Sequence, residues 1–205
     1  MFHVEQCLDL LLPDIDKVKA FQKLSFIKDE YFKWNSKINL SAIRDEKGFW
    51  EKHVIDSLCL ASFISKASFK DFDILDIGSG GGFPGLVLAS VLNNKITMVD
   101  PIKKKTDFLN HVALRLKLNN ASIYNGVFED IKGLGSNSVV VSRALGNYKD
   151  LNDHFTTINK DISVVIMAIE KQDLGVEGKV FNLEYELVNP LIDNVLNGHV
   201  LIKLN

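Results

Sequence analysis

Residues 72 to 85 read FDILDIGSGGGFPG. The first six residues are an apolar run that ends at Asp76 and Ile77, which is typical of a buried strand. Four glycines follow within five residues, and Pro84 then fits the first turn of a helix, where its missing N–H is not needed. Glycine lets a chain turn with positive φ and lets a ligand lie against bare backbone. A strand, a glycine loop and a helix in this order predict a site for a nucleotide-type cofactor.

The spacing of the glycines selects the kind of cofactor. A dinucleotide site needs Gly-x-Gly-x-x-Gly, and its third glycine would fall at Phe83. The chain instead has Gly78, Gly80 and Gly82, preceded by Asp76, and an acid there suits an ammonium group and a sulfonium better than a pyrophosphate. This spacing resembles motif I of Rossmann-like methyltransferases. We therefore expect these four residues to bind S-adenosylmethionine, the alternative being a glycine-rich turn without a ligand.

Two later strand ends supply further candidate cofactor contacts. Asp100 ends the next expected strand, 22 residues after Gly78, where a carboxylate accepts hydrogen bonds from both ribose hydroxyls. Glu129 or Asp130 follows the third strand, at the place from which adenine contacts usually come.

Hydrophobic patterning predicts an α/β fold with two parts. Before residue 70 the pattern is helical, with one apolar stripe from Phe21 to Trp34 and a second helix over Glu46–Ile64. After it, helical patterns at 84–92, 103–118 and 148–159 separate the early strands, which implies parallel pairing. Strands are expected at 72–77, 95–100, 121–125, 139–142, 162–169, 179–188 and 199–204, the last two forming an antiparallel edge. We expect a Rossmann-like, mostly parallel seven-stranded core over residues 71–205 and an N-terminal helical cap over 1–70, within one compact domain.

Bulk properties narrow the class of protein. The chain has 205 residues and a formal net charge of -2, with no apolar run of the ~18 residues that a membrane helix needs. The N-terminus lacks the basic and apolar regions of a secretory signal, and Cys7 and Cys59 have no metal-ligand spacing. We expect a cytoplasmic protein with reduced thiols and no metal. Residues 95–120 carry six basic residues and two acids, which makes either a basic face or an ordinary solvated helix.

Three more stretches point to one family. Residues 34–58 read WNSKINLSAIRDEKGFWEKHVIDSL, residues 99–118 read VDPIKKKTDFLNHVALRLKL, and residues 141–151 read VSRALGNYKDL. Together with DIGSGGGFPG they resemble the bacterial 16S rRNA (guanine-N7) methyltransferases, also called glucose-inhibited division protein B. The resemblance spans about residues 30 to 152 and is far more specific than the glycine loop alone.

The resemblance implies a class I methyltransferase that uses S-adenosylmethionine. It implies cofactor contacts at Gly78, Phe83, Phe128, Glu129 and Arg143, and methylation at N7 of one guanine in the small-subunit RNA (guanine 527 in the usual rRNA numbering). Guanine N7 is a lone pair on a neutral base, so it attacks a sulfonium methyl without first losing a proton. Catalysis then rests on alignment and desolvation, which fits a chain with no evident nucleophile–base pair.

The remaining candidates each have a structural alternative. Arg143 and His53 are the expected catalytic residues, although His53 and Asp56, three apart on one helix face, also fit a packing pair. Phosphate contacts in 16S rRNA or the small ribosomal subunit are expected from basic residues on two segments. These are Lys103, Lys104, Lys105, Arg115 and Arg44, of which Arg44 alternatively pairs with Asp45 or Glu46.

Two stretches depart from the family's pattern, and two other functions stay open. Where relatives have Ala-Leu-Lys-Gly the chain has Glu170 in place of the lysine, and where an Arg-His pair is usual it has Gly198 before His199. Both departures concern the substrate side. The alternatives are a methyltransferase of a small molecule or protein, and a non-enzymatic ribosome-binding module on the same scaffold. We expect a monomer.

Overall fold

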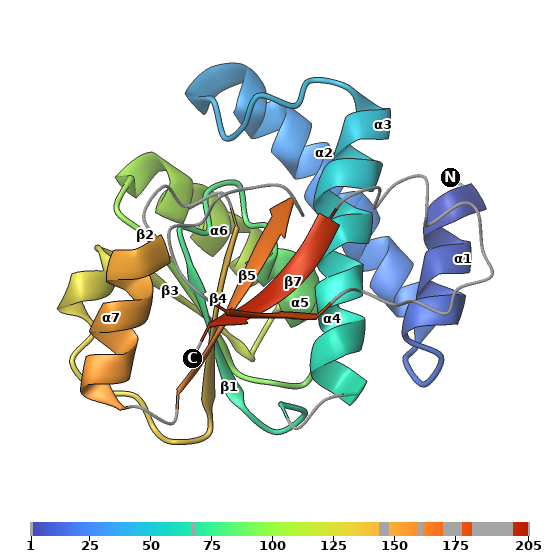
Figure 1. Ribbon diagram of the computed structural model, residues 1–205. Helices are drawn as coiled ribbons and strands as arrows, with labels where there is room; N and C mark the ends of the chain where they lie inside the picture. Colours follow the sequence, from blue (N-terminus) through green and yellow to red (C-terminus); the bar gives the residue numbers. More distant parts are fainter. Residues whose placement is uncertain are drawn as a thin grey trace.

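The computed structural model describes residues 2–66, 69–143, 148–159, 162–169, 178–181 and 199–204. The strands of this part form one seven-stranded sheet in the order β3-β2-β1-β4-β5-β7-β6 (Figure 1). Pairing is parallel from β3 through β5 and antiparallel for β5 with β7 and for β7 with β6. The strands are β1 (Asp73–Ile77), β2 (Ile96–Asp100), β3 (Ala121–Asn125), β4 (Ser138–Arg143), β5 (Ser163–Ile169), β6 (Gly178–Phe181) and β7 (His199–Leu204). The predicted parallel sheet with an antiparallel edge is thereby confirmed.

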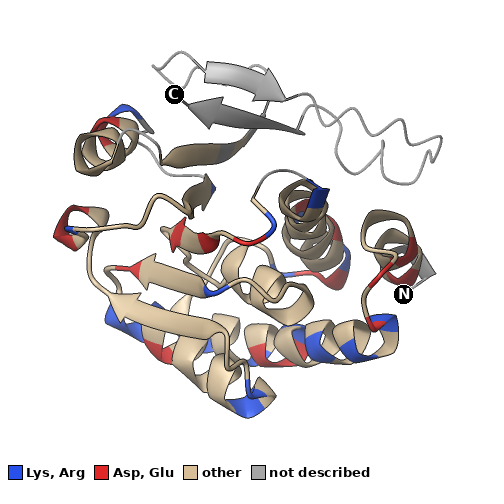
Figure 2. Ribbon diagram, turned by 90° about the horizontal axis from the view of Figure 1, so that it is seen from below, with Lys and Arg blue, Asp and Glu red and all other residues tan. Residues whose placement is uncertain are grey.

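Helices cover both faces of this sheet (Figures 1 and 2). Alternate side chains of a strand point to opposite faces, and in β1 Ile74 belongs to one apolar cluster while Leu75 and Ile77 belong to another. The first cluster packs the sheet against helices that precede and follow β1 in the sequence, and the second packs it against α7. The helices are α1 (Phe2–Leu11), α2 (Lys17–Ile38), α3 (Glu46–Gly48), α4 (Asp56–Lys66), α5 (Gly85–Val91), α6 (Lys103–Leu116) and α7 (Tyr148–Ile158), with a π-helix η1 (Phe49–Ile55) and a 3-10 turn η2 (Phe128–Asp130).

Long helix α2 lies across α5 and α6, so it forms an outer layer on that face of the molecule. Its N-terminus is capped by Asp16, whose carboxylate accepts the backbone N–H of Lys19 at 3.0 Å, and Asn39 ends it with a left-handed φ of 56°. Leu24, Ile27 and further apolar residues of α2 are fully buried, which confirms the predicted apolar stripe. The proposed division at residue 70 stays a prediction, because the segments before and after it share this one core.

Six of the seven predicted strands agree with the observed ones within one residue. The sixth was expected over 179–188 and is observed over Gly178–Phe181, and the rest of that segment, like Glu170 and Gly198, lies outside the described residues. Helix α1 was not predicted. The helix expected over 46–64 is instead three consecutive segments, α3, η1 and α4, because the chain widens into a π-helix in its middle.

Two absences concern the described residues only. None of their helices is long and apolar enough to cross a membrane. No group of three or more His, Cys, Asp or Glu side chains among them is arranged to hold a metal ion.

Candidate cofactor-binding site

The glycine loop lies where the order of strands in the sheet reverses. After β1 the chain runs outward to β2 and then β3, and it returns to place β4 on the other side of β1. In an open parallel sheet a ligand binds in the crevice outside the carboxyl ends of the strands at such a point. Residues 78 to 84 leave β1 at this edge, and Ser142 near the end of β4 donates its hydroxyl to the carbonyl of Ile77 at 3.0 Å. This bond ties the end of β1, from which the loop leaves, to β4.

Backbone angles in the loop require glycine. Gly78, Gly80 and Gly82 have φ values of 74°, 56° and 91°. At Gly82 a Cβ would lie 2.3 Å from Leu86 Cδ1, whereas at Gly80 the nearest heavy atom would be 3.7 Å away. Gly82 is therefore packed against α5, and Gly80 presents bare backbone to open space. Of the three predicted glycines, Gly80 offers the surface against which a ligand can lie.

Gly85 takes the packing role that a dinucleotide fold gives to its third glycine. A Cβ there would lie 2.4 Å from Met98 Cγ and 2.6 Å from Asp76 Oδ2. Only glycine lets the first turn of α5 approach β1 and β2 this closely. The dinucleotide spacing would place this glycine at position 83, which is Phe83 in this chain.

Asp76 has one satisfied and one unsatisfied carboxylate oxygen. Its Oδ2 accepts the backbone N–H of Gly85 at 3.0 Å, and its Oδ1 has no hydrogen-bond partner among the residues that the structure describes. Burial raises the pKa of this carboxyl to about 6, although the hydrogen bond from the backbone of Gly85 and the charge of Arg143 act against the increase. A buried oxygen without a partner is costly. It is the kind of atom that a bound cationic or hydrogen-bonding ligand satisfies.

Asp100 ties the glycine loop to the end of β2. Its Oδ2 accepts the backbone N–H of Gly80 and its Oδ1 that of Ile102, both at 2.9 Å, and the residue is 3% exposed. A carboxylate oxygen has two lone pairs, so both oxygens keep capacity for a ligand hydroxyl. The predicted ribose contact at Asp100 stays a prediction, and the structure adds a loop-anchoring role.

Phe128 and Glu129 lie in η2, one short connection after β3. Phe128 packs on His154 and Phe155 of α7, with ring centroids 5.5 and 6.3 Å apart, while Glu129 is exposed. The predicted cofactor contacts at Phe128 and Glu129, and an adenine contact from Glu129 or Asp130, stay predictions.

The ring of Phe83 faces the protein and not the open side of the loop. It is 3% exposed and stacks on His53 at 4.3 Å with an interplanar angle of 2°, with the edges of Tyr31 and Phe49 around it. The predicted contact of Phe83 with a cofactor stays a prediction, and the covered ring favours contact through its main chain. Its side chain fixes the loop to α2 and η1.

Arg143 ends β4 and binds one turn of the neighbouring helical segment. Its guanidinium donates to the carbonyl of Lys52 at 2.6 Å, to Asp56 Oδ2 at 3.1 Å and to His53 Nδ1 at 2.8 Å. Its carbon Cζ lies 6.0 Å from the centre of the Phe83 ring. The predicted catalytic pair Arg143 and His53 is thus in direct contact, next to the glycine loop. His53 and Asp56 each bond Arg143, and a role of the pair in lining the cofactor or target pocket stays a prediction.

Burial holds His53 in its neutral form. The residue is 5% exposed, and burial together with the charge of Arg143 lowers its pKa from 6.5 to about 3, against the opposing charge of Asp56. A histidine with this pKa does not take up a proton near neutral pH. It is therefore unsuited to general-base catalysis there.

The five predicted RNA contacts do not form one patch. Lys103 and Lys104 are exposed and Lys105 is partly so, all in the first turn of α6, where Lys103 bonds Asp107. Arg115 is in the last turn of that helix, about 18 Å further along its axis. Arg44 bonds Asn39 and the carbonyl of Ser41, so the ion pair with Asp45 or Glu46 is not formed. Figure 2 shows the strands largely tan, with Lys and Arg mostly on the helices.

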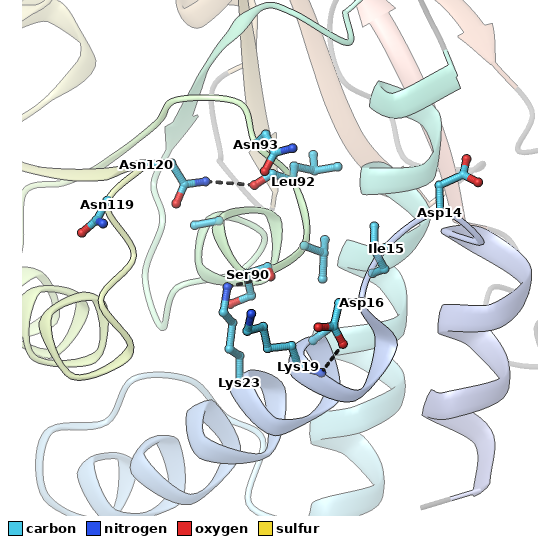
Figure 3. A pocket seen from close by; sticks show the side chains of 13 residues that line it. Asp14, Ile15, Asp16, Lys19, Lys23, Ser90, Leu92, Asn93, Asn119 and Asn120 are labelled. Atoms are coloured by element: carbon cyan, nitrogen blue, oxygen red, sulfur yellow. Dashed lines mark hydrogen bonds between the residues drawn. The ribbon is translucent and has the colours of Figure 1, made fainter.

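A cavity of about 480 Å³ lies at the opposite end of α5 from the glycine loop (Figure 3). Lysines, aspartates and asparagines line it together, including Lys23, which donates to the carbonyl of Ser90 at 3.2 Å, and Asn120, which donates to that of Leu92 at 3.0 Å. Its charges are mixed in sign. None of its lining residues belongs to the candidate site.

The strand order, the switch-point loop and the left-handed glycines define a Rossmann-like class I methyltransferase fold. The family model for rRNA small subunit methyltransferase G matches residues 20–180, and the chain belongs to that family. Relatives named ribosomal RNA small subunit methyltransferase G include those of Cellvibrio japonicus, 36% identical over 133 residues, and Fusobacterium nucleatum, 38% identical over 131 residues. The matches cover 64% and 63% of this chain, and only 60% and 54% of those relatives' own length.

Solved structures with the same fold are much more distant in sequence. A mutant of MtNAS in complex with S-adenosylmethionine has a TM-score of 0.58 and 13% identity, covering 88% of this chain and 76% of that one. The bifunctional kinase-methyltransferase WbdD has a TM-score of 0.54 and 12% identity, covering 89% and 46%. At this identity the likeness concerns the fold alone.

Proposed function

We propose that the protein transfers a methyl group from S-adenosylmethionine to N7 of a guanine in 16S rRNA. The observation that carries the proposal is the glycine loop at the switch point, where Gly80 has open space before its backbone and Asp76 has a buried carboxylate oxygen with no partner in the described part of the chain. Membership of the rRNA small subunit methyltransferase G family supports the choice of substrate.

The residues present fit such a cofactor. Gly80 offers backbone for close approach, Asp76 offers a buried acceptor for the amino-acid part, and Asp100 offers acceptors for the ribose hydroxyls. Phe128 and Glu129 would flank the adenine. When bound, the cofactor supplies an electrophilic methyl group on a positively charged sulfur.

The reaction requires the protein to align N7 with the methyl group, and it requires no proton transfer. The cofactor would supply its methyl group to the lone pair of N7 and would leave as a neutral thioether, with the positive charge then on the purine. No proton moves, so a neutral, buried His53 is consistent with this reaction. Arg143 uses three N–H donors on η1 and α4, and its other two find no acceptor in the described part of the chain. We assign these two to the cofactor or the target base.

The substrate side is assigned to the first turn of α6. Lys103, Lys104 and Lys105 follow β2 at the same sheet edge as the glycine loop, so they would hold rRNA phosphates next to the cofactor. Arg115 and Arg44 would contact more distant parts of the RNA. The protein would act in the cytoplasm, as a monomer, on the small ribosomal subunit or its RNA.

The test is methyl transfer to 30S subunits isolated from a strain that lacks the modification. With radiolabelled S-adenosylmethionine, label is expected in 16S rRNA, and mapping of the modified nucleotide should give N7-methylguanine. Label only in protein or small molecules would refute the substrate. Absence of binding to S-adenosylhomocysteine in isothermal titration would refute the enzyme altogether and favour a ribosome-binding module.

A further inference from the structure

A chain of hydrogen bonds runs from Arg143 into the protein interior. From His53 Nδ1 it continues through His53 Nε2 to Ser41 Oγ at 3.0 Å, and from Ser41 Oγ to Tyr31 Oη at 2.5 Å. Tyr31 Oη then donates to the carbonyl of Ile43 at 3.0 Å. The chain thus links the end of β4 to η1, to the turn after α2 and to α2 itself.

The direction of every bond in this chain follows from Arg143. A guanidinium only donates, so His53 Nδ1 must be the acceptor, and the proton of the neutral ring is on Nε2. Nε2 then donates to Ser41 Oγ, which also accepts the backbone N–H of Ile43 at 3.2 Å. The hydroxyl proton of Ser41 is left for Tyr31 Oη, and that of Tyr31 for the Ile43 carbonyl.

Asn35 closes the network from the other side. Its Nδ2 donates to Tyr31 Oη at 3.2 Å and to the Ile43 carbonyl at 2.8 Å, and its Oδ1 accepts the backbone N–H of Ser41 at 3.1 Å. Each donor therefore meets an acceptor in one consistent arrangement. A fully satisfied buried network of this kind fixes one geometry, because any reversal leaves a group unpaired.

We propose that His53 is a positioning residue, whose Nδ1 accepts from Arg143 and orients its guanidinium, while Ser41 and Tyr31 satisfy the Nε2 proton on the other side of the ring. The role rests on the proposed function, in which Arg143 contacts the cofactor or the target base. His53 stacks on Phe83 of the cofactor loop, so the same ring sets the loop and the arginine relative to each other. This role replaces the proton-transfer role that a histidine near a reacting base suggests.

The alternative is that His53 only fills space between Phe83, Tyr31 and Phe49. Two amide substitutions separate the explanations. In His53→Asn the Oδ1 atom stands near the place of Nδ1 and keeps an acceptor for Arg143. In His53→Gln the amide reaches toward the place of Nε2, so it keeps the contact with Ser41 and loses that acceptor. Gln leaves the smaller cavity, so a space-filling role ranks Gln above Asn, and the positioning role ranks Asn above Gln.

The experiment measures kcat/KM for methylation of 30S subunits and the melting temperature of both variants of the full chain. We expect His53→Gln to be about 10- to 100-fold less active than His53→Asn, the range for loss of one charged hydrogen bond, although Gln melts no lower than Asn. Activities that follow the melting temperatures, with Gln at or above Asn, would overturn the proposal.

Nitrogen-15 NMR of histidine-labelled protein tests the tautomer without cofactor or RNA. The expected His53 spectrum between pH 5 and 8 is that of a neutral ring protonated on Nε2. A ring protonated on Nδ1, or one that titrates in this range, would overturn the positioning role. A wild-type protein with the expected spectrum that fails to methylate 30S subunits would count against the proposed function alone.

Discussion

Gly80→Ala separates ligand binding from folding more sharply than any other change in the loop. At a φ of 56° the left-handed conformation costs alanine about 1–2 kcal/mol. The nearest described heavy atom to its methyl group would be 3.7 Å away. For a chain of this size about 2–4 °C is lost per kcal/mol, so we expect a melting temperature about 2–8 °C lower. The protein stays folded.

The added methyl group points to the open side of the loop, where the proposed cofactor lies. Placing it in a filled space costs about 1–3 kcal/mol in addition, which corresponds to a loss of about 5- to 150-fold in affinity. The backbone N–H of Gly80 binds Asp100 at 2.9 Å, so any shift of the loop to relieve the contact also disturbs that carboxylate.

The assay is isothermal titration with S-adenosylhomocysteine at a temperature where all variants are folded. Gly81→Ala is the matched control, since its Cβ would make only ordinary contacts, 3.4 Å from Tyr31 and 3.5 Å from Leu40. We expect affinity close to that of the wild type for Gly81→Ala and a large loss for Gly80→Ala. Equal affinities of Gly80→Ala and wild type would refute the placement of the cofactor against this residue.

Three further predictions concern packing, pH and the substrate side. Gly82→Ala puts a methyl group 2.3 Å from a leucine side chain of α5 at a φ of 91°, so urea titration should show a free energy of unfolding lower by about 2–5 kcal/mol, and an unchanged midpoint would contradict this packing. Folding lowers the pKa of His53 from 6.5 to about 3, so between these pH values the unfolded chain binds one proton more than the folded protein. The free energy of unfolding is therefore highest above pH 6.5, and protonation of His53 in the unfolded chain lowers it by about 2 kcal/mol by pH 5. The raised pKa of Asp76, about 6, changes stability with pH in the opposite direction, so the wild type is compared with His53→Phe, which keeps Asp76. The stability of His53→Phe should fall less steeply toward pH 5, and parallel curves for the two proteins would assign the effect to another group. Lys104→Gln should lower the slope of log affinity for 30S subunits against log salt concentration by about 1. Lys66→Gln, at the end of α4, is the control and should leave this slope unchanged. Equal slopes for the two variants would show that α6 is not part of the RNA interface.

Much of the fold follows from hydrophobic period and glycine spacing. Short apolar runs alternating with helical patterns were enough for the parallel sheet, because strands buried on both faces have few other arrangements. Helix α1 was missed although Val4, Leu8 and Leu11 follow a helical spacing and are buried. The π-helix was not predictable, since a seven-residue segment is too short for its period to be told from that of an α-helix.

The candidate site was predictable in its ligand-facing residues and not in its internal support. Asp76 and Asp100 were expected to bind a cofactor, and both also bond backbone N–H groups whose direction depends on loop angles that no residue pattern fixes. Tyr31, Asn35 and Ser41 were not predicted as partners of His53. Their association exists only after α2, the following turn and η1 come together, although a buried asparagine in an apolar stripe is a signal of such a network.

The π-helix η1 also constrains which changes in chain length this protein can accept. Arg143 has acceptors on Lys52 and His53 of η1, which is wound wider than an α-helix, and on Asp56 directly after it. Removing one residue from it would shift the register of everything before it by about 100° around the helix axis. The positions of Phe49 and Trp50, both buried, would then turn out of the core. Insertions and deletions between residues 49 and 55 should therefore be far more damaging than conservative substitutions at the same positions.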